Sequence, residues 1–286
     1  MKFYSTNKSS KLVSVERALL DGQAPDGGLY LPGVIPKFSP RKIASMSEMQ
    51  YPDIALEVLH PFLEESMPRG DLEDIVSEAY RDFPIPLEHV DDGKYLMRQD
   101  RGPTASFKDF AGVLIGRLMS YYTENDVSVV ITYPQDEVSA MQRKQMTTLG
   151  GNVRAIAVEG GKFDDCQAMN KRAFSDPELK HLNLSSANSI NIGRLLPQAC
   201  YYFYAYSQLC EGDENFVVSV PCGNFGNLTA GLIAKRMGLP VSKFIAAVNE
   251  NDVFQKFLYT GIYEPIVPSK NCISSAMNVG NLSNGM

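Results

Sequence analysis

The sequence predicts an α/β protein built on parallel sheets. From about residue 90 onward, short β-branched apolar runs alternate with longer runs in which apolar residues recur at helical spacing. This alternation is typical of strands joined by helical crossovers, which produce parallel sheets. The run at residues 216–220 has the length and composition of a strand covered on both faces. With 286 residues, 44% of them hydrophobic, the chain can bury more than one core.

The first 90 residues differ in pattern and predict an N-terminal domain. They contain short apolar stretches, many prolines and two helical patterns, at residues 47–63 and 71–80. The Pro84-Ile-Pro86 tripeptide marks the expected boundary, and residues 91–286 form the expected core. The core patterns predict strands at 95–97, 127–132, 153–158, 217–220 and 244–248, and helices from Lys108 and at 139–149, 163–174, 195–209 and after Asn227.

A loop with two glycines predicts a phosphate-binding cup. Gly223 and Gly226 permit positive φ, so the backbone N–H groups from Gly223 to Asn227 could converge on one point. A helix from about residue 228 to 237 would add the positive end of its dipole. The spacing matches neither a nucleotide P-loop nor a dinucleotide fingerprint, so the phosphate would belong to something other than ATP or NAD. The alternative is a tight strand-to-helix turn without a ligand.

Lys108 is the candidate catalytic residue. The spacing of Ser106 and Asp109 fits a helix-start box, which places Lys108 in the first helical turn. There the helix dipole disfavours a cation, and nearby aromatic residues such as Phe107 would lower the lysine pKa by desolvation. A neutral amine is what Schiff-base chemistry requires. The alternative is an exposed lysine at a helix start, which is the usual situation for this residue.

The two segments together resemble the threonine synthases, a family of pyridoxal-phosphate enzymes of fold type II. The resemblance rests first on Gly102-Pro-Thr-Ala-Ser-Phe-Lys-Asp109 and on Pro221-Cys-Gly-Asn-Phe-Gly-Asn227. Further matches in the same order are Ala24-Pro-Asp-Gly-Gly-Leu-Tyr-Leu-Pro32, Gln145-Met-Thr-Thr-Leu-Gly150, Ser185-Ser-Ala-Asn-Ser-Ile-Asn-Ile-Gly-Arg194, Asn249-Glu-Asn-Asp252 and Ala276-Met-Asn-Val-Gly280. Several ordered matches along nearly the whole chain are far more specific than one short motif.

The resemblance implies a tryptophan-synthase-β-like architecture with two parallel-sheet lobes and an N-terminal extension. It implies pyridoxal 5'-phosphate as cofactor, with Lys108 forming the Schiff base and Gly223, Asn224, Phe225, Gly226 and Asn227 holding the cofactor phosphate. The implied activity is a carbon–oxygen lyase acting on phosphates, which converts O-phospho-L-homoserine and water to L-threonine and phosphate. Lys108 would then carry protons between the substrate carbons.

Two other functions stay open. One is a different fold-type II lyase, such as a serine or threonine dehydratase, although the N-terminal block at residues 24–32 is unusual for dehydratases. The other is a homologue that binds the cofactor without turnover. Phosphate release from phosphohomoserine, compared with keto-acid formation from threonine, would separate these possibilities.

The chain departs from the family pattern after the lysine helix. Threonine synthases carry a Thr-Ser-Gly-Asp-Thr-Gly-type loop there, which binds the substrate carboxylate, but here the helix runs directly into the strand pattern at 127–132. The last segment of the large lobe, which would provide a hydroxyl partner for the pyridine nitrogen, is also missing. A lobe that lost a strand and a helix would expose apolar faces. We therefore favour omission of residues over a true deletion, and expect a chain break between about Ser120 and Ser128.

Three further residues are candidate substrate contacts: Asn188, Arg194 and Ser275. Asn188, Asn191 and Arg194 are spaced by three, so on a helix start they would share one face. Arg194 could bind a carboxylate or phosphate in a bidentate manner, but a structural role is favoured for it. Ser275 precedes a matched motif and could line the cleft or form a turn.

Composition fits a cytoplasmic enzyme. The net charge is −6 without a basic cluster, which argues against nucleic acid, and no apolar run suits a membrane or a signal peptide. The five cysteines form no Cys-x-x-Cys pair and the three histidines show no ligand spacing, so we expect neither a metal site nor a disulfide framework. The expected partner is a small-molecule substrate, O-phospho-L-homoserine, and the expected assembly is a monomer or a homodimer.

Overall fold

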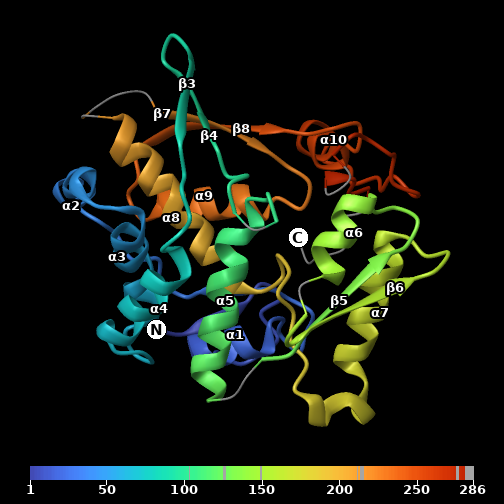
Figure 1. Ribbon diagram of the computed structural model, residues 1–286. Coiled ribbons are helices and arrows are strands. Elements are labelled where there is room, and N and C mark those ends of the chain that lie inside the picture. Colours follow the sequence, from blue (N-terminus) through green and yellow to red (C-terminus); the bar gives the residue numbers. More distant parts are fainter. Residues whose placement is uncertain are drawn as a thin grey trace. The chain divides into compact units, whose positions relative to one another are not determined.

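The computed structural model describes residues 1–102, 104–124, 127–148, 150–210, 212, 216–274 and 277–280 (Figure 1). The chain divides into two compact units. The first comprises Met1–Arg117 and Ala187–Met286, and the second comprises Leu118–Ser186. Residues 1–90 thus lie in one unit with the C-terminal hundred residues, and a separate N-terminal domain stays a prediction.

The first unit contains most of the helices. Its elements are β1 (Phe3–Ser5), α1 (Val15–Asp21), β2 (Tyr30–Pro32), α2 (Pro40–Ala44), η1 (Ser45–Glu48), α3 (Tyr51–Leu63), α4 (Arg69–Tyr80), β3 (Leu87–Asp91), β4 (Lys94–Met97), the first turns of α5 (Lys108–Thr123), α8 (Ile192–Leu209), β7 (Phe216–Pro221), α9 (Gly226–Arg236), β8 (Val241–Ala247) and α10 (Val253–Thr260). None of the helices in the described residues combines the length and apolar character needed to cross a membrane.

The second unit is smaller. It holds the end of α5, then β5 (Val129–Pro134), α6 (Ala140–Thr147), β6 (Val153–Val158), α7 (Phe163–Ser175) and the 3₁₀ helix η2 (Pro177–Leu182). The sequence predicts a chain break between about Ser120 and Ser128. Within this interval, residues 125 and 126 lie outside the described residues.

The predicted parallel pairing is confirmed in both units. Strand β5 pairs with β6 in parallel, and β7 pairs with β8 in parallel, each through a helical crossover. The strand at 95–97 does not join a parallel sheet. It forms β4 of an antiparallel hairpin with β3, because only a two-residue turn separates the two strands.

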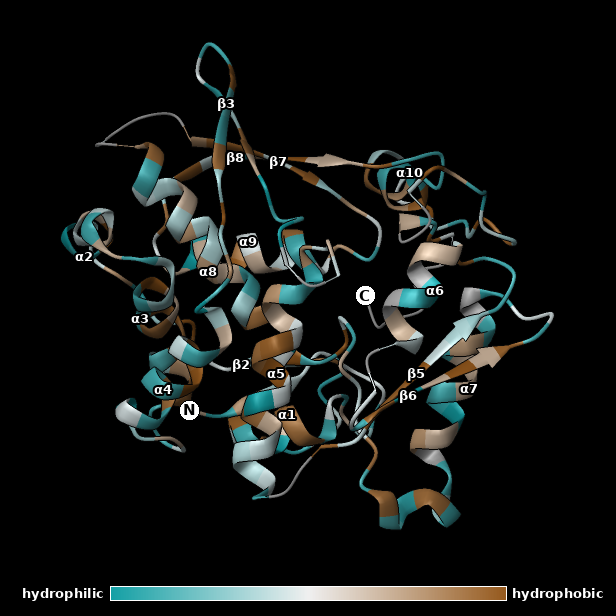
Figure 2. Cartoon of the chain, viewed as in Figure 1, coloured by the Kyte–Doolittle hydropathy of each residue, from teal (hydrophilic) through white to brown (hydrophobic). Residues whose placement is uncertain are grey.

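The expectation that residues 216–220 form a strand covered on both faces is wrong. Along β7 the exposure alternates, and Val217 is 43% exposed while Val220 is buried at 2%. In the described residues each sheet has only two strands, which leaves part of each face uncovered. The same holds in β5 and β6, where Val130 is 58% and Ile156 48% exposed (Figure 2 shows these apolar strands). Exposed apolar strand faces are what loss of a neighbouring strand and helix would produce.

Helix α8 is the centre of the first unit. Fourteen of its 18 residues are buried, and it packs against α1, α2, α3 and α9. Its aromatic run contacts a different element with each ring: Tyr201 contacts Phe110, Tyr202 contacts Phe244, Phe203 contacts Phe38, Tyr204 contacts Tyr51, and Tyr206 contacts Phe216. The run therefore packs the core, as a helix that is apolar on all sides should.

Asn191 fixes the start of α8. Its Oδ1 accepts a hydrogen bond from the Gly193 N–H at 2.8 Å, and its Nδ2 donates to the Leu19 carbonyl of α1 at 2.9 Å. The residue is fully buried, so both groups depend on these partners.

Asp26 joins the N-terminal segments in the same unit. Its carboxylate accepts hydrogen bonds from the Ser5 hydroxyl at 2.6 Å and from the N–H groups of Ser9, Ser10 and Gly28. The Ser5 hydroxyl, aided by these backbone donors, lowers the pKa of Asp26 to about 2. The matched block at residues 24–32 thus has a structural purpose, because it holds the first strand in place.

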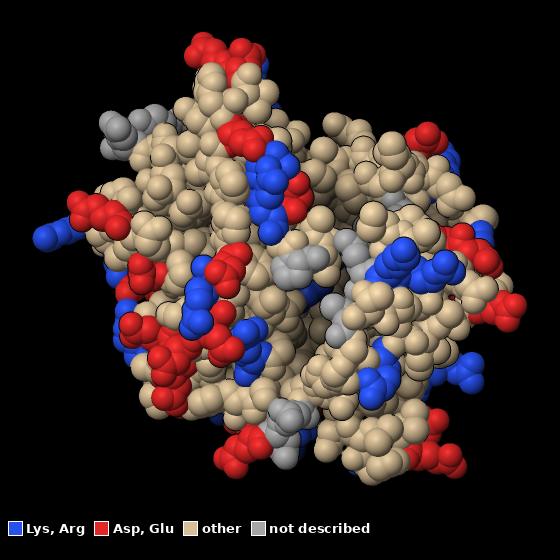
Figure 3. Space-filling view, viewed as in Figure 1, with Lys and Arg blue, Asp and Glu red and all other residues tan. Residues whose placement is uncertain are grey.

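Acidic side chains gather on the face that α4 presents (Figure 3), where Glu73, Asp74 and Glu78 are exposed. Glu78 forms an ion pair with Arg117 at 3.1 Å. Such exposed pairs contribute little to stability, so the unit depends on its apolar core and on buried hydrogen bonds.

We predict that Asn191→Ala lowers the free energy of unfolding by about 1–3 kcal/mol, because it removes a helix cap and a buried hydrogen bond to the Leu19 carbonyl. Urea denaturation measures this loss. Gln208→Ala on the exposed side of the same helix is the control, and it should change stability by less than about 0.5 kcal/mol. Equal effects of the two substitutions would contradict the structural role of Asn191.

We predict a pH-dependent effect for Asp26→Asn. The folded-state pKa is depressed from 3.8 to about 2, so the ionised carboxylate stabilises the fold above pH 4 and this contribution is lost as the pH falls toward 2. The variant should be less stable than the parent at pH 6, and the difference should shrink by pH 3. Urea midpoints across this range test it, and a pH-independent difference would argue against the carboxylate.

Candidate active site

The start of α5 is built on Asp109, which is buried at 7% exposure. Its carboxylate accepts hydrogen bonds from the Thr104 N–H at 2.8 Å and from the Thr104 hydroxyl at 2.5 Å. The Ser106 hydroxyl accepts from the Lys108 N–H at 3.2 Å. The predicted box is therefore only partly correct: the Asp109 N–H donates to the Ser106 carbonyl at 2.9 Å, but the Asp109 carboxylate accepts from Thr104.

Gly102 makes this turn possible. A Cβ atom at residue 102 would lie 2.5 Å from the Asp109 Oδ2 and 2.8 Å from its Cβ. The Gly102-to-Asp109 motif is therefore a compact loop that presents Lys108 as the first residue of α5.

Lys108 has a perturbed amine. Its side chain is exposed to solvent, while desolvation by nearby protein atoms and the positive charge of Arg194 lower the pKa of the amine. The lowered pKa increases the neutral fraction of the amine near neutral pH. The direction of the pKa shift agrees with the prediction, while the exposure of the side chain agrees with the alternative, an exposed lysine at a helix start.

Arg194 supports the Lys108 turn. Its Nη1 donates a hydrogen bond to the Lys108 carbonyl at 3.2 Å. Burial lowers the pKa of the Arg194 guanidinium, while the negative charge of Asp109 opposes this shift. Since this hydrogen bond goes to the backbone, the structure favours the positioning role for Arg194.

Helix α8 also holds the start of α9. The hydroxyls of Tyr201 and Tyr202 donate to the Asn227 Oδ1 at 2.7 and 2.5 Å. Burial raises the pKa of both phenols, which keeps them protonated as donors. Gln198 connects Arg194, which contacts the Lys108 carbonyl, with Tyr201, which contacts Asn227. Its Nε2 donates a hydrogen bond to the Arg194 carbonyl, and its Oε1 lies 3.1 Å from the Tyr201 hydroxyl. Side chains of one helix, α8, thus contact both the Lys108 backbone and Asn227.

The cup at residues 223–227 forms differently from the sequence prediction. Neither Gly223 nor Gly226 has positive φ, and the left-handed residue is Phe225 at φ 58°. The glycines serve close packing instead. A Cβ at Gly223 would lie 2.8 Å from the Met277 Cα, and one at Gly226 would lie 3.2 Å from the Ser189 Cβ.

The start of α9 has no side-chain cap. Phe225 is the N-cap residue and makes no side-chain capping hydrogen bond. The first N–H groups of a helix have no partner within the helix, and they favour an anion together with the dipole. A phosphate is thus a suitable partner for the main chain here.

The remaining candidates are not on one helix face. Helix α8 begins at Ile192, so Asn188 lies before the helix and is exposed, while Asn191 is the buried cap. The predicted shared face of Asn188, Asn191 and Arg194 is wrong for this reason. Ser275 lies outside the described residues.

Several residues that shape the site were not predicted from the sequence. From sequence alone, four of them would be assigned to a loop or to core packing: Thr104, Gln198, Tyr201 and Tyr202. In the structure their polar groups form hydrogen bonds that orient the turn before Lys108 and the start of α9. The aromatic run signalled only a buried helix, because sequence does not show which hydroxyl finds which partner.

Comparison with known proteins agrees with this arrangement. The family model "Threonine synthase N terminus" matches residues 2–80. Threonine synthase from Escherichia coli is 39% identical over 99% of this chain and 72% of its own length, and that from Haemophilus influenzae is 37% identical over the same shares. This chain belongs to the threonine synthase family. The resemblance inferred from sequence is thereby confirmed.

Solved threonine synthases have the same fold. The crystal structure from Escherichia coli superposes with a TM-score of 0.92 at 38% identity, over 99% of this chain and 72% of that one. The pyridoxal-phosphate-bound threonine synthase from Brucella melitensis also gives a TM-score of 0.92, at 36% identity over 99% of this chain and 68% of that one. The predicted fold-type II architecture is confirmed.

The alignment with threonine synthases also shows missing residues. It extends over 311 positions, whereas this chain has 286 residues, so at least 25 aligned positions have no residue here. This number suits the loss of a strand, a loop and a helix.

We predict that Gly223→Ala lowers the free energy of unfolding by about 1–3 kcal/mol, since the new Cβ would overlap the Met277 backbone. Gly70→Ala in α4 is the control, because a Cβ atom at residue 70 would meet nothing within 4 Å and alanine favours a helix. That variant should be unchanged or slightly more stable. Chemical denaturation compares them, and a neutral Gly223→Ala would show that the loop is not tightly packed.

Proposed function

We propose that this protein converts O-phospho-L-homoserine and water to L-threonine and phosphate, with pyridoxal 5'-phosphate as its cofactor. The observation that carries the proposal is the joint support of two segments by α8. One presents a lysine of lowered pKa, and the other is an open helix start beside a glycine loop. Membership of the threonine synthase family supports both the activity and the cofactor.

The residues fit the proposed cofactor. The loop from Gly223 to Asn227 precedes an uncapped helix start and carries no charged side chain, so its N–H groups would hold the phosphate. Lys108 would hold the aldehyde end. Bound pyridoxal phosphate supplies an electron sink for carbanions formed beside the substrate amino group.

The chain's own residues would organise the proton transfers. Lys108 Nζ, whose lowered pKa increases the unprotonated fraction that can accept a proton, would take and return protons at the substrate carbons. Thr104 and Asp109 hold the turn that orients it, and Arg194 holds its carbonyl. These contacts fix the backbone from which the amine extends, and a fixed starting point favours the orientation that proton transfer requires.

Asn188 and Ser275 are the proposed substrate contacts. Asn188 is exposed and precedes Ser189, which packs against Gly226 of the cup. Ser275 is two residues from Met277, which packs against Gly223. Asn188 thus precedes a residue that packs on the loop that would hold the phosphate, Ser275 is proposed only from its place before a matched motif, and Arg194 would act by positioning Lys108.

The expected setting is a cytoplasmic enzyme that acts on a small molecule rather than on nucleic acid. A net charge of −6 supports the second point, and five free cysteines suit a reducing compartment. The protein would be a monomer or a homodimer, which light scattering distinguishes.

We predict that Lys108→Ala abolishes covalent cofactor capture and lowers phosphate release from phosphohomoserine by more than about 10³-fold. Borohydride reduction of the parent with pyridoxal phosphate, followed by peptide mapping, should place the label on Lys108. Lys235→Ala on the exposed face of α9 is the control and should keep both properties. Labelling of another lysine, with activity retained in Lys108→Ala, would refute the assignment.

One alternative has an observation of its own. At least 25 aligned positions are missing, which favours a homologue that binds the cofactor without turnover. In that case Lys108 would still be labelled, but neither phosphate from phosphohomoserine nor keto acid from threonine would form. Keto-acid formation alone would indicate a dehydratase.

A further inference from the structure

We propose that residues 249–254 form a brace that holds the phosphate cup in its binding conformation, with Asn249, Asn251 and Phe254 as positioning residues. The proposal rests on the proposed function, since it assumes that the loop from Gly223 to Asn227 binds a phosphate. The brace connects β8 to α10 and reaches the cup along two separate routes.

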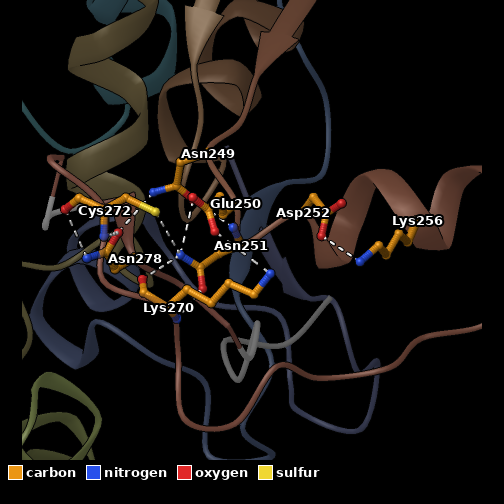
Figure 4. A network of polar contacts seen from close by, with 8 residues as sticks. All are labelled: Asn249, Glu250, Asn251, Asp252, Lys256, Lys270, Cys272 and Asn278. Carbon is orange, nitrogen blue, oxygen red and sulfur yellow. Dashed lines mark hydrogen bonds and ion pairs between the residues drawn. The ribbon is translucent and has the colours of Figure 1, made fainter.

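The first route is a network of asparagines (Figure 4). Asn249 Oδ1 accepts hydrogen bonds from the backbone N–H and the side-chain Nδ2 of Asn251, at 3.0 and 3.2 Å. Asn249 Nδ2 then donates to the Met277 carbonyl at 3.3 Å and to the Asn278 Oδ1 at 2.9 Å. Asn251 thus orients Asn249, and Asn249 holds the backbone of Met277.

Met277 transmits this restraint to the cup. Its Cα lies 2.8 Å from the position that a Cβ of Gly223 would take, so the two backbones are in close contact. Asn251 further anchors the same C-terminal segment, because its Oδ1 accepts from the Lys270 N–H at 2.7 Å and its Nδ2 donates to the Lys270 carbonyl at 2.9 Å. Asn251 is buried at 7% exposure, which makes these bonds costly to lose.

The second route is an aromatic contact. The ring of Phe254, in the first turn of α10, lies 4.4 Å from the ring of Phe225. Phe225 has the left-handed backbone conformation that starts α9, which is unfavourable for a non-glycine residue. The ring contact stabilises this conformation. Without it, Phe225 would be expected to relax and move the first N–H groups of α9.

The charged residues of the segment contribute less. Glu250 is mainly exposed and its oxygen is 4.0 Å from the Lys270 Nζ, while Asp252 pairs with Lys256 within one turn. Exposed pairs of this kind are weak. Glu250 is therefore a matched control within the same segment.

The test compares pyridoxal phosphate with pyridoxal, which lacks the phosphate. Dissociation constants for both are measured by absorption titration of the purified full chain, in the parent, Asn249→Asp, Phe254→Leu and Glu250→Gln. Asn249→Asp replaces the donor to the Met277 carbonyl by an acceptor, and Phe254→Leu removes the ring but keeps an apolar side chain.

We expect Asn249→Asp and Phe254→Leu each to weaken pyridoxal phosphate binding about tenfold, and to weaken competition by inorganic phosphate similarly. Pyridoxal binding should stay within about twofold of the parent, since Lys108 is not disturbed. Glu250→Gln should change the dissociation constant of neither ligand. A general loss of stability would weaken the binding of both ligands equally. The ratio of the dissociation constants for pyridoxal phosphate and pyridoxal therefore reports on the cup alone.

The proposal would be refuted if the parent and both variants bound pyridoxal phosphate with equal dissociation constants. It would also be refuted if the variants bound pyridoxal phosphate and pyridoxal more weakly by the same factor. Failure of the parent to bind pyridoxal phosphate at all would instead refute the proposed function. If Asn249→Asp does not fold, Phe254→Leu decides the result by the same ratio.

Discussion

The packing of two loops against the start of α8 is the constraint on which this structure depends. Arg194 donates to the Lys108 carbonyl, and Leu195 and Ser189 lie against Gly226 at the start of α9. Asn191 ties the same end of α8 to the Leu19 carbonyl of α1. One buried helix end therefore places a lysine and an anion-binding helix start in fixed relation, although they lie over 100 residues apart in the chain.

Buried polar groups give this arrangement its chemistry. Phenol hydroxyls kept protonated by burial orient Asn227, and a buried carboxylate at Asp109 shapes the turn before Lys108. Each of these groups has a partner, which prevents the cost of an unsatisfied polar atom. The amine of Lys108 differs, because desolvation and the charge of Arg194 lower its pKa although its side chain is exposed. The hydrogen-bonded groups around Asp109 and Arg194 thus hold the backbone that carries Lys108.

The same architecture is incomplete at its sheets. Val130, Ile156, Val217 and Ile245 remain exposed on strands that would be covered in a larger parallel sheet. The threonine synthases that match this chain are longer by at least 25 aligned positions. Residues of α8 and the backbone of Met277 contact the cup, and the proposed 249–254 brace would add to these contacts.

Local sequence by itself determined the parallel strand–helix order, the lysine at a helix start and the loop before α9, because periodicity and motif order are properties of the chain. It predicted positive φ at Gly223 and Gly226, but tertiary packing assigned that conformation to Phe225 and used the glycines for close contact. It also predicted one face for Asn188 and Asn191, whereas packing on α1 made Asn191 a buried cap. Hydrogen-bond partners and exposed strand faces depend on contacts between distant segments, which only the folded chain decides.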